Sequence, residues 1–463
     1  MSDVSLSSTL LPQTLAEQLR RAGQTALIDR FAQLTPQQRA KLLAQLQAID
    51  FAWLARVWRS TIAEVRPDEI APYRQAIAID DPRRDQARAR GEQALAKGEV
   101  ACLLVAGGSG SRLGFDGPKG AFPLGAVSKR TLFELHLDRL LALGKRYGTV
   151  PLLFLMTGPD NHQQTLKLFA DNQNYGYPSE RLQIFQQGVA PALDEHGQLL
   201  LAEPDSLVLS PNGNGGLFAA LAACGAYDRM ERAGVKAISY IQVDNALSQS
   251  CDPLFCGYHL LAGSQYSCKG LKKRSASEKV GVFAKVNGRL TIVEYYEIPA
   301  ALSAQTAADG ELLFGLANPG LFVFDLDFMR AQAARDDLPF HKAHKKIAHI
   351  SAEGERITPD RPNGYKLEAF ALDTLPEASP ALVLICEREE EFAPVKNMHG
   401  EDSPETARQL MQQRFARWLA QAGVEVAPGA NVEIAARYAL DQAELAARLT
   451  AGQRFFVDTF LDG

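Results

Sequence analysis

The sequence predicts an α/β fold with a mostly parallel sheet, a helical N-terminal part and a small C-terminal domain. Apolar runs with the length of buried strands occur at residues 100–105, 150–156 and 237–243. Segments with helical spacing or helix-capping signals alternate with the first of these runs, a pattern typical of a parallel sheet. Each run ends in glycine or polar residues, and the carboxyl ends of the strands are where such sheets bind ligands.

We expect the N-terminal part, residues 1–95, to be helical. Thr35 and Gln38 form a capping box, with Pro36 at the first helical position. Leu42 and Leu46 follow at helical spacing. This part contains no group of residues suited to chemistry, so we expect it to serve packing or oligomer contact.

The alternation of strands and helices occupies the central part, residues 96–380. Within it, Thr131 and Glu134 form a second capping box, which predicts a helix through Leu143. A further helix is expected over residues 163–172. We interpret the whole central part as the catalytic domain.

The last part, residues 381–463, begins with an apolar run at 381–386 that predicts one more strand. A helix is expected from Arg408 through Ala422, followed by a region rich in Gly, Pro and Val. We interpret this part as a small C-terminal domain.

Three histidines and three lysines share the segment FHKAHKKIAHI at residues 340–350. His341 and Lys345 are four residues apart, as are Lys345 and His349, so a helix here would have one basic face. Such a face could touch a substrate phosphate, but a solvated helix face is the favoured interpretation.

Composition bounds the class of protein. The chain has 463 residues, 46% of them hydrophobic and 22% charged, which is typical of a globular protein with two or three domains. The net charge of −5 gives no reason to expect a nucleic-acid partner. No apolar run approaches the ~20 residues that span a bilayer, and the N-terminus lacks the features of a secretory signal, so we expect no membrane partner. The six cysteines form no CxxC pair, which favours reduced thiols in a cytoplasmic protein without a zinc site.

The most informative stretch is LLVAGGSGSRLGFDGPKGAFP at residues 103–123. Gly107, Gly108 and Gly110 follow a predicted strand, and glycine allows the backbone N–H groups of a loop to approach an anion closely. Arg112 and Lys119 add positive charge. A backbone cradle with two nearby cations is suited to the phosphates of a nucleoside triphosphate.

The spacing of this loop excludes two common nucleotide motifs. A P-loop requires Gly-Lys-Ser/Thr, which is absent, and a dinucleotide fingerprint requires its third glycine one residue before Gly114, which argues against an oxidoreductase. The remaining pattern, G-G-x-G-x-R-L-G followed by Pro118-Lys119, resembles the signature of nucleotidyltransferases that make nucleotide sugars. The alternative is a strand–turn–helix corner with surface charges, among them a solvated Lys119.

Asp244 is the candidate metal ligand. It follows the predicted strand at 237–243, and Mg²⁺ binds carboxylate and phosphate oxygens together with water. A turn at Asp244-Asn245 that merely ends the strand accounts for the pair equally well by itself. The glycine loop, expected at the same sheet edge, favours the metal.

With these motifs in view, the chain resembles eukaryotic-type UDP-N-acetylhexosamine pyrophosphorylases from about residue 95 to residue 411. Nine stretches match the family's motifs in the family's order, and each alone would be weak. They are LLVAGGSGSRLG with PKG (103–120), MTG (156–158), FQQG (185–188), PNGNGGLFAAL (211–221), VDN (243–245), KVGVFAKVNGRLTIVEYYE (279–297), LFGLANPGLF (313–322), PNGYKLE (362–368) and EEFAPVKN (390–397).

The resemblance implies a Rossmann-like nucleotidyltransferase domain and a reaction. UTP and a sugar 1-phosphate, first of all N-acetylglucosamine 1-phosphate, would give a UDP-sugar and pyrophosphate with Mg²⁺ as cofactor. The sugar phosphate would attack the α-phosphorus directly, so positioning and charge stabilisation would carry the catalysis. A monomer or a homodimer is expected.

The resemblance also implies roles for individual residues. Arg112, Lys119 and Lys396 would neutralise phosphate charge, and Asp244 would hold the metal. The nucleotide would be bound by Gly107, Gly108, Gly110, Thr157, Gly158, Gln187, Gly213 and Asn245. The sugar would be bound by Asn214, Gly281, Glu294 and Asn318. For Glu294 the alternative is a solvent-facing strand residue paired with Glu297, and for Gln187 it is a polar strand end.

Two departures from the family pattern fall near the expected sugar site. Asn318 is retained, but the residues beside it, Ala317 and Pro319, differ from the family's usual ones. Leu372 stands where a second phenylalanine is typical, while Phe370 is kept. A UDP-glucose or broad UDP-sugar pyrophosphorylase therefore stays open, as does, more remotely, a nucleotide-sugar-binding protein without activity.

Overall fold

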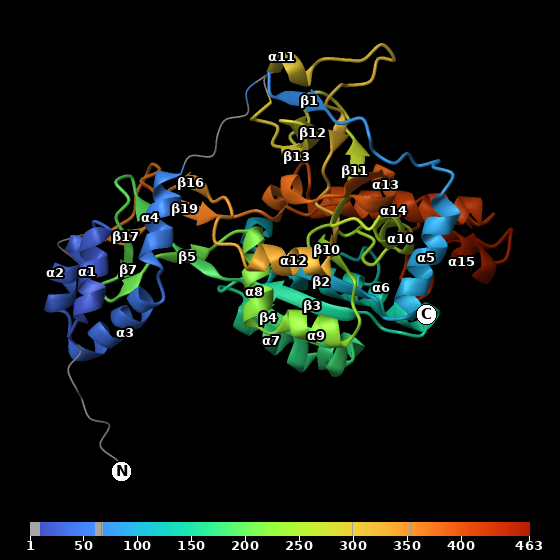
Figure 1. Ribbon diagram of the computed structural model, residues 1–463. Helices are drawn as coiled ribbons and strands as arrows, with labels where there is room; N and C mark the ends of the chain where they lie inside the picture. The colour runs from blue at the N-terminus through green and yellow to red at the C-terminus, as the bar shows by residue number, and fades with distance from the viewer. Residues whose placement is uncertain (1–9, 61–65, 67, 299, 352–353) are drawn as a thin grey trace. The chain divides into compact units, whose positions relative to one another are not determined.

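The computed structural model describes residues 10–60, 66, 68–298, 300–351 and 354–463 (Figure 1). The start of the chain, expected not to be a secretory signal, includes residues 1–9, which lie outside this part. Contacts divide the chain into two compact units. The first unit comprises Met1–Glu64, Gly188–Gly216 and Arg335–Asp373, and the second comprises Val65–Gln187, Leu217–Ala334 and Thr374–Gly463. The boundaries of these units differ from the predicted domain boundaries at 95 and 380. A contact-based division does not test domain boundaries, so the boundaries at 95 and 380 stay a prediction.

The first unit combines N-terminal helices with short strands from two later segments. Leu19, Leu42 and Leu46 are fully buried and share one core with Leu193 and Leu367. The helices are α1 (Gln13–Arg21), α2 (Thr25–Gln33), α3 (Pro36–Gln47) and α4 (Phe51–Arg59). The strands are β5 (Val189–Pro191), β6 (Leu193–Asp194), β7 (Leu201–Glu203), β8 (Ser206–Leu207), β9 (Leu209–Pro211), β16 (His341–Lys345), β17 (His349–Ile350), β18 (Arg356–Ile357) and β19 (Gly364–Glu368). The capping box predicted at Thr35 is confirmed at the start of α3.

The prediction of a basic helix over the histidine-rich segment is wrong. His341 and its neighbours form strand β16, which pairs antiparallel with β19. Successive side chains of a strand point to opposite faces, so residues four apart do not form the helical face that was expected. The pairing places the ring of His344 on the ring of Tyr365, with centroids 4.7 Å apart, and His344 Nε2 lies 3.2 Å from Glu195 Oε1.

The second unit is built on an 11-stranded sheet, which is mixed rather than purely parallel. Strands β10, β2, β3 and β4 are adjacent and parallel, as are β11 and β20, whereas β15 runs antiparallel between β10 and β11. The strands are β1 (Ile70–Pro72), β2 (Val100–Ala106), β3 (Leu152–Thr157), β4 (Leu182–Gln186), β10 (Ala237–Gln242), β11 (Tyr266–Lys272), β12 (Val282–Val286), β13 (Arg289–Val293), β14 (Leu316–Ala317), β15 (Phe322–Asp325) and β20 (Ala381–Ile385). The predicted strands in the central part and the one at 381–386 are thus confirmed within two residues.

Helices cover this sheet, and one of them, α6, begins where a capping signal predicts it. Helix α6 begins at the Thr131–Glu134 capping box and extends one turn past Leu143, to a left-handed Gly148. Helix α14 begins at Ser403, because a capping box and Pro404 start it before the predicted Arg408. The main helices are α5 (Arg84–Ala96), α6 (Leu132–Tyr147), α7 (His162–Asp171), α8 (Leu217–Ala223), α9 (Ala226–Arg232), α10 (Pro253–Leu261), α12 (Leu326–Ala333), α14 (Pro404–Gln421) and α15 (Gln442–Arg448). None of the helices described is long and apolar enough to cross a membrane.

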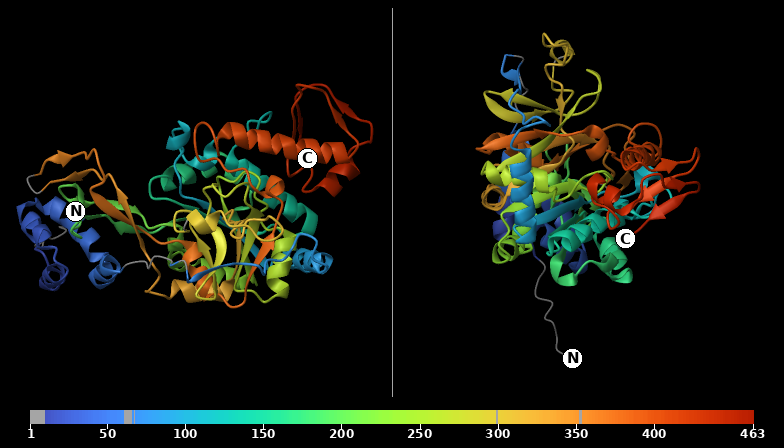
Figure 2. Two further views of the ribbon diagram at one scale, coloured as in Figure 1. Left: turned by 90° about the horizontal axis from the view of Figure 1, so that it is seen from above. Right: turned by 90° about the vertical axis from the view of Figure 1, so that its right-hand side faces the viewer.

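The C-terminal part packs on the main sheet rather than standing apart. Trp418 and Leu419 of α14 and Leu445 of α15 belong to the same core as Cys102 and Leu104 of β2. Figure 2 shows α14 as the long orange helix beside the last, red strands, β22 (Val432–Ile434) and β24 (Thr459–Leu461). The shared core makes the C-terminal part structurally continuous with the sheet.

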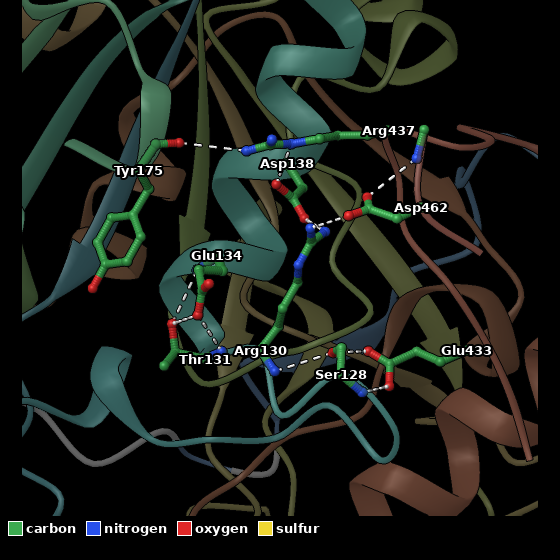
Figure 3. A network of polar contacts seen from close by, with 10 residues as sticks. Ser128, Arg130, Thr131, Glu134, Asp138, Tyr175, Glu433, Arg437 and Asp462 are labelled. Atoms are coloured by element: carbon green, nitrogen blue, oxygen red, sulfur yellow. Dashed lines mark hydrogen bonds and ion pairs between the residues drawn. The ribbon is translucent and has the colours of Figure 1, made fainter. Parts of the chain in front are cut away.

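Polar contacts also hold the C-terminal part in place (Figure 3). The buried carboxylate of Glu433 accepts hydrogen bonds from the main-chain N–H groups of Val127 and Ser128, at 2.7 and 3.0 Å. Asp138 is paired with both Arg130 and Arg437. Burial raises the pKa of Asp138 to about 6, although the two arginines act in the opposite direction.

Candidate functional site

The glycine loop forms a backbone cradle at the carboxyl end of β2. Gly110 N donates to Gly117 O over 2.8 Å, and Lys119 N donates to Gly108 O over 3.1 Å, so the loop folds back on itself. Among the described residues, no acceptor faces the main-chain N–H groups of Gly107, Gly108 and Ser109. Three consecutive N–H groups without an internal partner are suited to binding an anion.

A lysine and a carboxylate meet beside this cradle. Lys119 Nζ lies 3.3 Å from Asp244 Oδ2, and each side chain is only 15% exposed. A Cβ atom on Gly108 would lie 3.6 Å from Lys119 Cε, which places the lysine against the loop. The alternative of a solvated surface lysine is therefore wrong, since Lys119 is half-buried and paired.

The donor set around Asp244 fits a magnesium ion shared with a nucleotide. No group of three or more His, Cys, Asp or Glu side chains that could hold a metal occurs in the described part of the chain. Mg²⁺, however, is commonly held by one or two carboxylates together with substrate phosphates and water. Asp244 lies at the end of β10, which pairs in parallel with the strand that leads into the cradle.

Four parallel strands bring their carboxyl ends together at this point. A Cβ on Gly107 would lie 3.2 Å from Gln187 Oε1 and 3.3 Å from Gly158 N. Gln187 follows β4, and its main-chain N donates to Thr157 O over 2.8 Å. The predicted nucleotide residues after β2, β3 and β4 are thus brought within contact distance of one another.

Thr157 differs from its neighbours because its hydroxyl is used inside the protein. It is fully buried, donates to Phe185 O over 3.0 Å and lies 2.7 Å from His162 Nδ1. Burial lowers the pKa of His162, which favours the neutral ring. A contact between Thr157 and a nucleotide remains a prediction.

Asn161 is a site residue that the sequence analysis missed. Its Oδ1 accepts from Gly158 N at 2.8 Å, and its Nδ2 donates to Ala106 O and Gly108 O at 2.9 and 3.0 Å. The amide therefore fixes the loops after β2 and β3 relative to each other. Asn161 directly precedes α7, but its side chain makes no helix-capping hydrogen bond, so the common capping role of asparagine does not reveal this one.

Three of the predicted sugar-binding residues lie together. Asn318 N donates to Gly281 O over 2.8 Å, and a Cβ on Gly281 would lie 3.1 Å from Glu294 Oε1. Glu294 follows the end of β13, and its main-chain N donates to Glu297 Oε2 over 2.9 Å. Glycine at 281 therefore leaves room for the Glu294 carboxylate.

The unusual residues after Asn318 connect this group to the carboxyl end of β10. Gly320 has a left-handed φ of +74°, and its N–H donates to Asn318 Oδ1 over 2.9 Å. A Cβ on Gly320 would lie 3.1 Å from Nε2 of Gln242, which ends β10 two residues before Asp244. The altered flank thus orients Asn318 through a turn that glycine favours.

Two predicted site residues, Gly213 and Asn214, belong to the first unit. Gly213 has a φ of +81°, and a Cβ there would lie 2.1 Å from Ala369 O, so no side chain fits. Asn214 Oδ1 accepts from Ala371 N at 2.9 Å. The two residues form a tight loop against residues 369–371. Within that segment, the ring of Phe370 lies 4.8 Å from the ring of His341, measured between centroids.

Asn245 holds the segment that leads to Lys396. Its side chain is buried, donates to Glu391 O over 2.8 Å and accepts from Ala393 N over 2.9 Å. Val395 N donates to the main-chain oxygen of Asp244 over 2.8 Å. Both ends of the Asn245 amide are therefore used by the protein, and its contact with a nucleotide remains a prediction.

The two other predicted cations are more exposed than Lys119. Lys396 Nζ lies 3.4 Å from Asp402 Oδ2, with 48% of the side chain exposed. Arg112 is exposed on the short 3₁₀ turn Ser111–Leu113, with no carboxylate at ion-pair distance in the described residues. Both side chains follow segments anchored at the cradle or at Asp244.

Comparisons with known proteins show the family of the chain. The family model described as UTP–glucose-1-phosphate uridylyltransferase matches residues 52–426. UDP-N-acetylglucosamine diphosphorylase 2 of Arabidopsis thaliana is 31% identical, with 91% of this chain and 89% of the relative covered. UDP-N-acetylglucosamine pyrophosphorylase of Saccharomyces cerevisiae is 33% identical, with 91% of each chain covered. The crystal structure of the UDP-N-acetylglucosamine pyrophosphorylase of Trypanosoma brucei superposes with a TM-score of 0.79 at 27% identity, covering 96% of this chain and 95% of that one.

Proposed function

Because the chain belongs to the UTP–glucose-1-phosphate uridylyltransferase family, we propose that it transfers the uridylyl group of UTP to N-acetylglucosamine 1-phosphate. The products are UDP-N-acetylglucosamine and pyrophosphate. The observation that carries the proposal is the pairing of Lys119 with Asp244 beside three unpartnered N–H groups of the glycine loop. This combination offers a nucleoside triphosphate both a backbone cradle and a cation.

The reaction is one in-line displacement at the α-phosphorus. A phosphate oxygen of the sugar 1-phosphate forms a bond to that phosphorus, the bond to the oxygen bridging to the β-phosphorus breaks, and pyrophosphate leaves with the electron pair. No proton has to be moved by the protein. The work of the chain is therefore to position the two phosphates and to offset their charge.

Each charged residue has a place in this scheme. The N–H groups of residues 107–109 face the triphosphate, and Lys119 offsets charge that develops on the α-phosphate and on pyrophosphate. Arg112 and Lys396 supply further positive charge from the exposed edges of the site. Asp244 would hold Mg²⁺, which when bound offsets the charge of the phosphates.

The specificity for the base and the sugar rests on the polar residues around the cradle. The amide of Gln187, at the end of β4, presents a donor and an acceptor suited to one edge of uracil. Glu294 and Asn318 supply acceptors and donors for sugar hydroxyls and the acetamido group. We favour N-acetylglucosamine over glucose because relatives that cover about nine-tenths of the chain carry that sugar in their names.

Pyrophosphate release tests the proposal. Purified protein is mixed with UTP, Mg²⁺ and one of four 1-phosphates, of glucose, galactose, N-acetylglucosamine or N-acetylgalactosamine. We expect turnover with N-acetylglucosamine 1-phosphate, reduced about 10²- to 10³-fold in Lys119→Met. Lys167→Met is the matched control and should keep full activity, because Lys167 is exposed and pairs with Asp171, four residues later on the same helix. A preference for glucose 1-phosphate would overturn the sugar assignment, and no release with any of the four would overturn the proposed reaction.

A further inference from the structure

A second polar cavity lies in the second unit, apart from the residues of the candidate site. Its volume is about 350 Å³, within the size range of small-molecule sites, and none of the predicted site residues lines it. The lining includes Arg84, Arg88, Arg139, Lys269, Glu391 and Trp418. The reaction proposed above uses none of these side chains.

The floor of the cavity is a buried charge cluster with one unsatisfied oxygen. Lys269 is 2% exposed, and its Nζ pairs with Asp252 Oδ2 at 2.8 Å and with Glu391 Oε1. Burial by itself lowers the pKa of Lys269, but the two carboxylates raise it above its usual value, so the ammonium stays charged. The other oxygen of Glu391, Oε2, is buried and has no hydrogen-bond partner among the described residues. A buried acceptor without a partner is costly. A donor on a ligand would satisfy this oxygen once the Glu391 carboxylate turns toward the cavity, because the oxygen has almost no accessible surface as it stands.

Three arginines in the walls of the cavity form no ion pair among the described residues, although acidic side chains such as Glu387, Glu390 and Asp441 also line it. Arg139 is buried and donates from Nε to the main-chain oxygen of Ser250 over 3.1 Å, and Arg84 donates to Ile79 O over 2.9 Å. Arg88 is exposed, and none of the three arginines has a carboxylate within ion-pair distance in the described part of the chain.

Two of these arginines, Arg84 and Arg88, lie in the first two turns of α5. Arg84 and Arg88 are four residues apart on α5, so they lie on one face of the helix, where like charges repel. Arg84 is also the first residue of α5, where the helix dipole adds positive potential. A dianionic phosphate between the two guanidinium groups would relieve the repulsion and would accept bidentate hydrogen bonds.

We propose that this cavity binds a phosphorylated polyol, such as a sugar phosphate, as a second ligand. The phosphate lies against Arg84 and Arg88, and a hydroxyl donates to Oε2 of Glu391. Free phosphate alone would leave that carboxylate oxygen without a donor, and a simple cation would leave the arginines without an anion. The indole of Trp418, held by its Nε1–H bond to Glu390 Oε2 at 3.2 Å, supplies an apolar wall for the carbon skeleton.

The cavity is connected to the candidate site through one residue. The main-chain oxygen of Glu391 accepts the side-chain amide of Asn245, and Ala393, two residues later, donates to the same amide. Asn245 directly follows Asp244. A ligand that donates a hydrogen bond to the Glu391 carboxylate therefore contacts the segment that anchors Asn245 and leads to Lys396. We expect such a ligand to change the rate of turnover.

Binding of glucose 6-phosphate, measured by calorimetry and by the shift in melting temperature, tests the proposal. We expect binding to the wild type that is weakened at least tenfold in Arg88→Ala. It should persist in Arg232→Ala, which removes an exposed arginine of α9 outside the cavity, and in Lys119→Met, which impairs the candidate site. Inorganic phosphate and glucose should each bind at least tenfold more weakly.

Each contrary result has a distinct meaning. Loss of binding in Lys119→Met with retention in Arg88→Ala would show that glucose 6-phosphate binds the candidate site, and would overturn the proposal. Equal binding of inorganic phosphate would overturn the role of Glu391, and no binding at all would overturn the site. Glucose 6-phosphate should also change the rate of pyrophosphate release at least twofold in the wild type and not in Arg88→Ala. Binding without a change in rate would overturn the connection through Asn245. The binding readouts do not depend on the proposed reaction, so the two can fail separately.

Discussion

Replacing Gly108 by alanine should weaken UTP binding at least tenfold while leaving the fold intact. Gly108 does not have a left-handed φ, and a Cβ at this position would meet only Lys119 Cε at 3.6 Å and Nζ at 4.0 Å, which are ordinary contacts. Alanine is therefore compatible with the backbone, and the free energy of unfolding should stay the same or rise by about 0.4–1 kcal/mol. The new methyl group, however, would lie beside the Lys119 side chain, where the proposed function places the triphosphate.

The cost for the ligand can be worked out from one hydrogen bond. Losing one N–H bond to a charged phosphate costs about 1.5–3 kcal/mol, which corresponds to about 10- to 150-fold in the dissociation constant for UTP. Calorimetric titration with UTP, together with a thermal melt, measures both quantities. Ser109→Ala is the matched control, because it changes the same loop without adding bulk.

A contrasting variant separates a cradle effect from a folding effect. In Gly120→Ala the Cβ would lie 2.3 Å from Cζ of the buried Phe133, so this variant should lose stability first. Unchanged UTP affinity in a folded Gly108→Ala protein would refute the argument that residues 107–109 form the phosphate cradle. A large loss of stability in the same variant would refute the argument from open space.

Three further variants test other parts of the structure. Asp244→Ala should abolish Mg²⁺-dependent turnover with little change in melting temperature, and full activity would remove Asp244 from the metal site. Glu294→Ala should raise the KM for the sugar 1-phosphate at least tenfold while the KM for UTP stays constant; equal changes in both would indicate a structural role. His259 is buried, and its Nδ1 lies 2.8 Å from Ser267 Oγ. Burial lowers the pKa of His259 from 6.5 to about 3, so as the pH falls the unfolded chain binds a proton at this ring before the folded chain does. The free energy of unfolding should therefore decrease below pH 6.5. His259 alone should make it about 1.4 kcal/mol lower at pH 5.5 than at pH 7.5. Thermal melts of His259→Gln at the two pH values should lack this difference.

Local sequence signals predicted the elements that form the core of the second unit. Apolar runs located β2, β3 and β10, and the hydroxyl-to-glutamate spacing located the start of α6. The resemblance to UDP-N-acetylhexosamine pyrophosphorylases is confirmed by the family match and by relatives above 30% identity. These features succeed because each is set by neighbouring residues, through side-chain period and capping bonds.

Pairing between distant segments was beyond such signals. The histidine-rich segment has four-residue spacings that fit a helix, yet it becomes β16 because β19, about twenty residues later, offers it a partner strand. Strand β15 likewise enters the sheet antiparallel between β10 and β11, which makes the sheet mixed. Strand formation depends on a partner that the local sequence does not contain.

The candidate site shows the same division between local and distant information. Parallel strands place their carboxyl ends at one edge, so the meeting of Gly107 and Gly158 followed from the fold class. Gln187 was added to this group only by the family resemblance, because the strand before it, β4, was not predicted. Asn161 was missed because its role is to satisfy main-chain groups of two loops, which no motif in the sequence records. Gln242 was missed for a similar reason, since its neighbour Gly320 is distant in the chain.

Asp244 and Asn245, which follow β10, have different contacts: one side chain faces Lys119 and the other holds the segment that leads to Lys396. The Asp244 side chain faces Lys119, and its main-chain oxygen accepts from Val395 N, while the Asn245 side chain holds residues 391 and 393. The carboxylate proposed to hold the metal and the segment carrying Lys396 are therefore fixed by the same two residues. A change that loosens Asn245 should displace Lys396 and Asp244 together, so its effect on turnover should exceed that of removing Lys396 alone. Comparing turnover in Asn245→Ala and Lys396→Ala, each verified as folded by its melt, checks this expectation, and a smaller loss in Asn245→Ala would show that the two sets of contacts are independent.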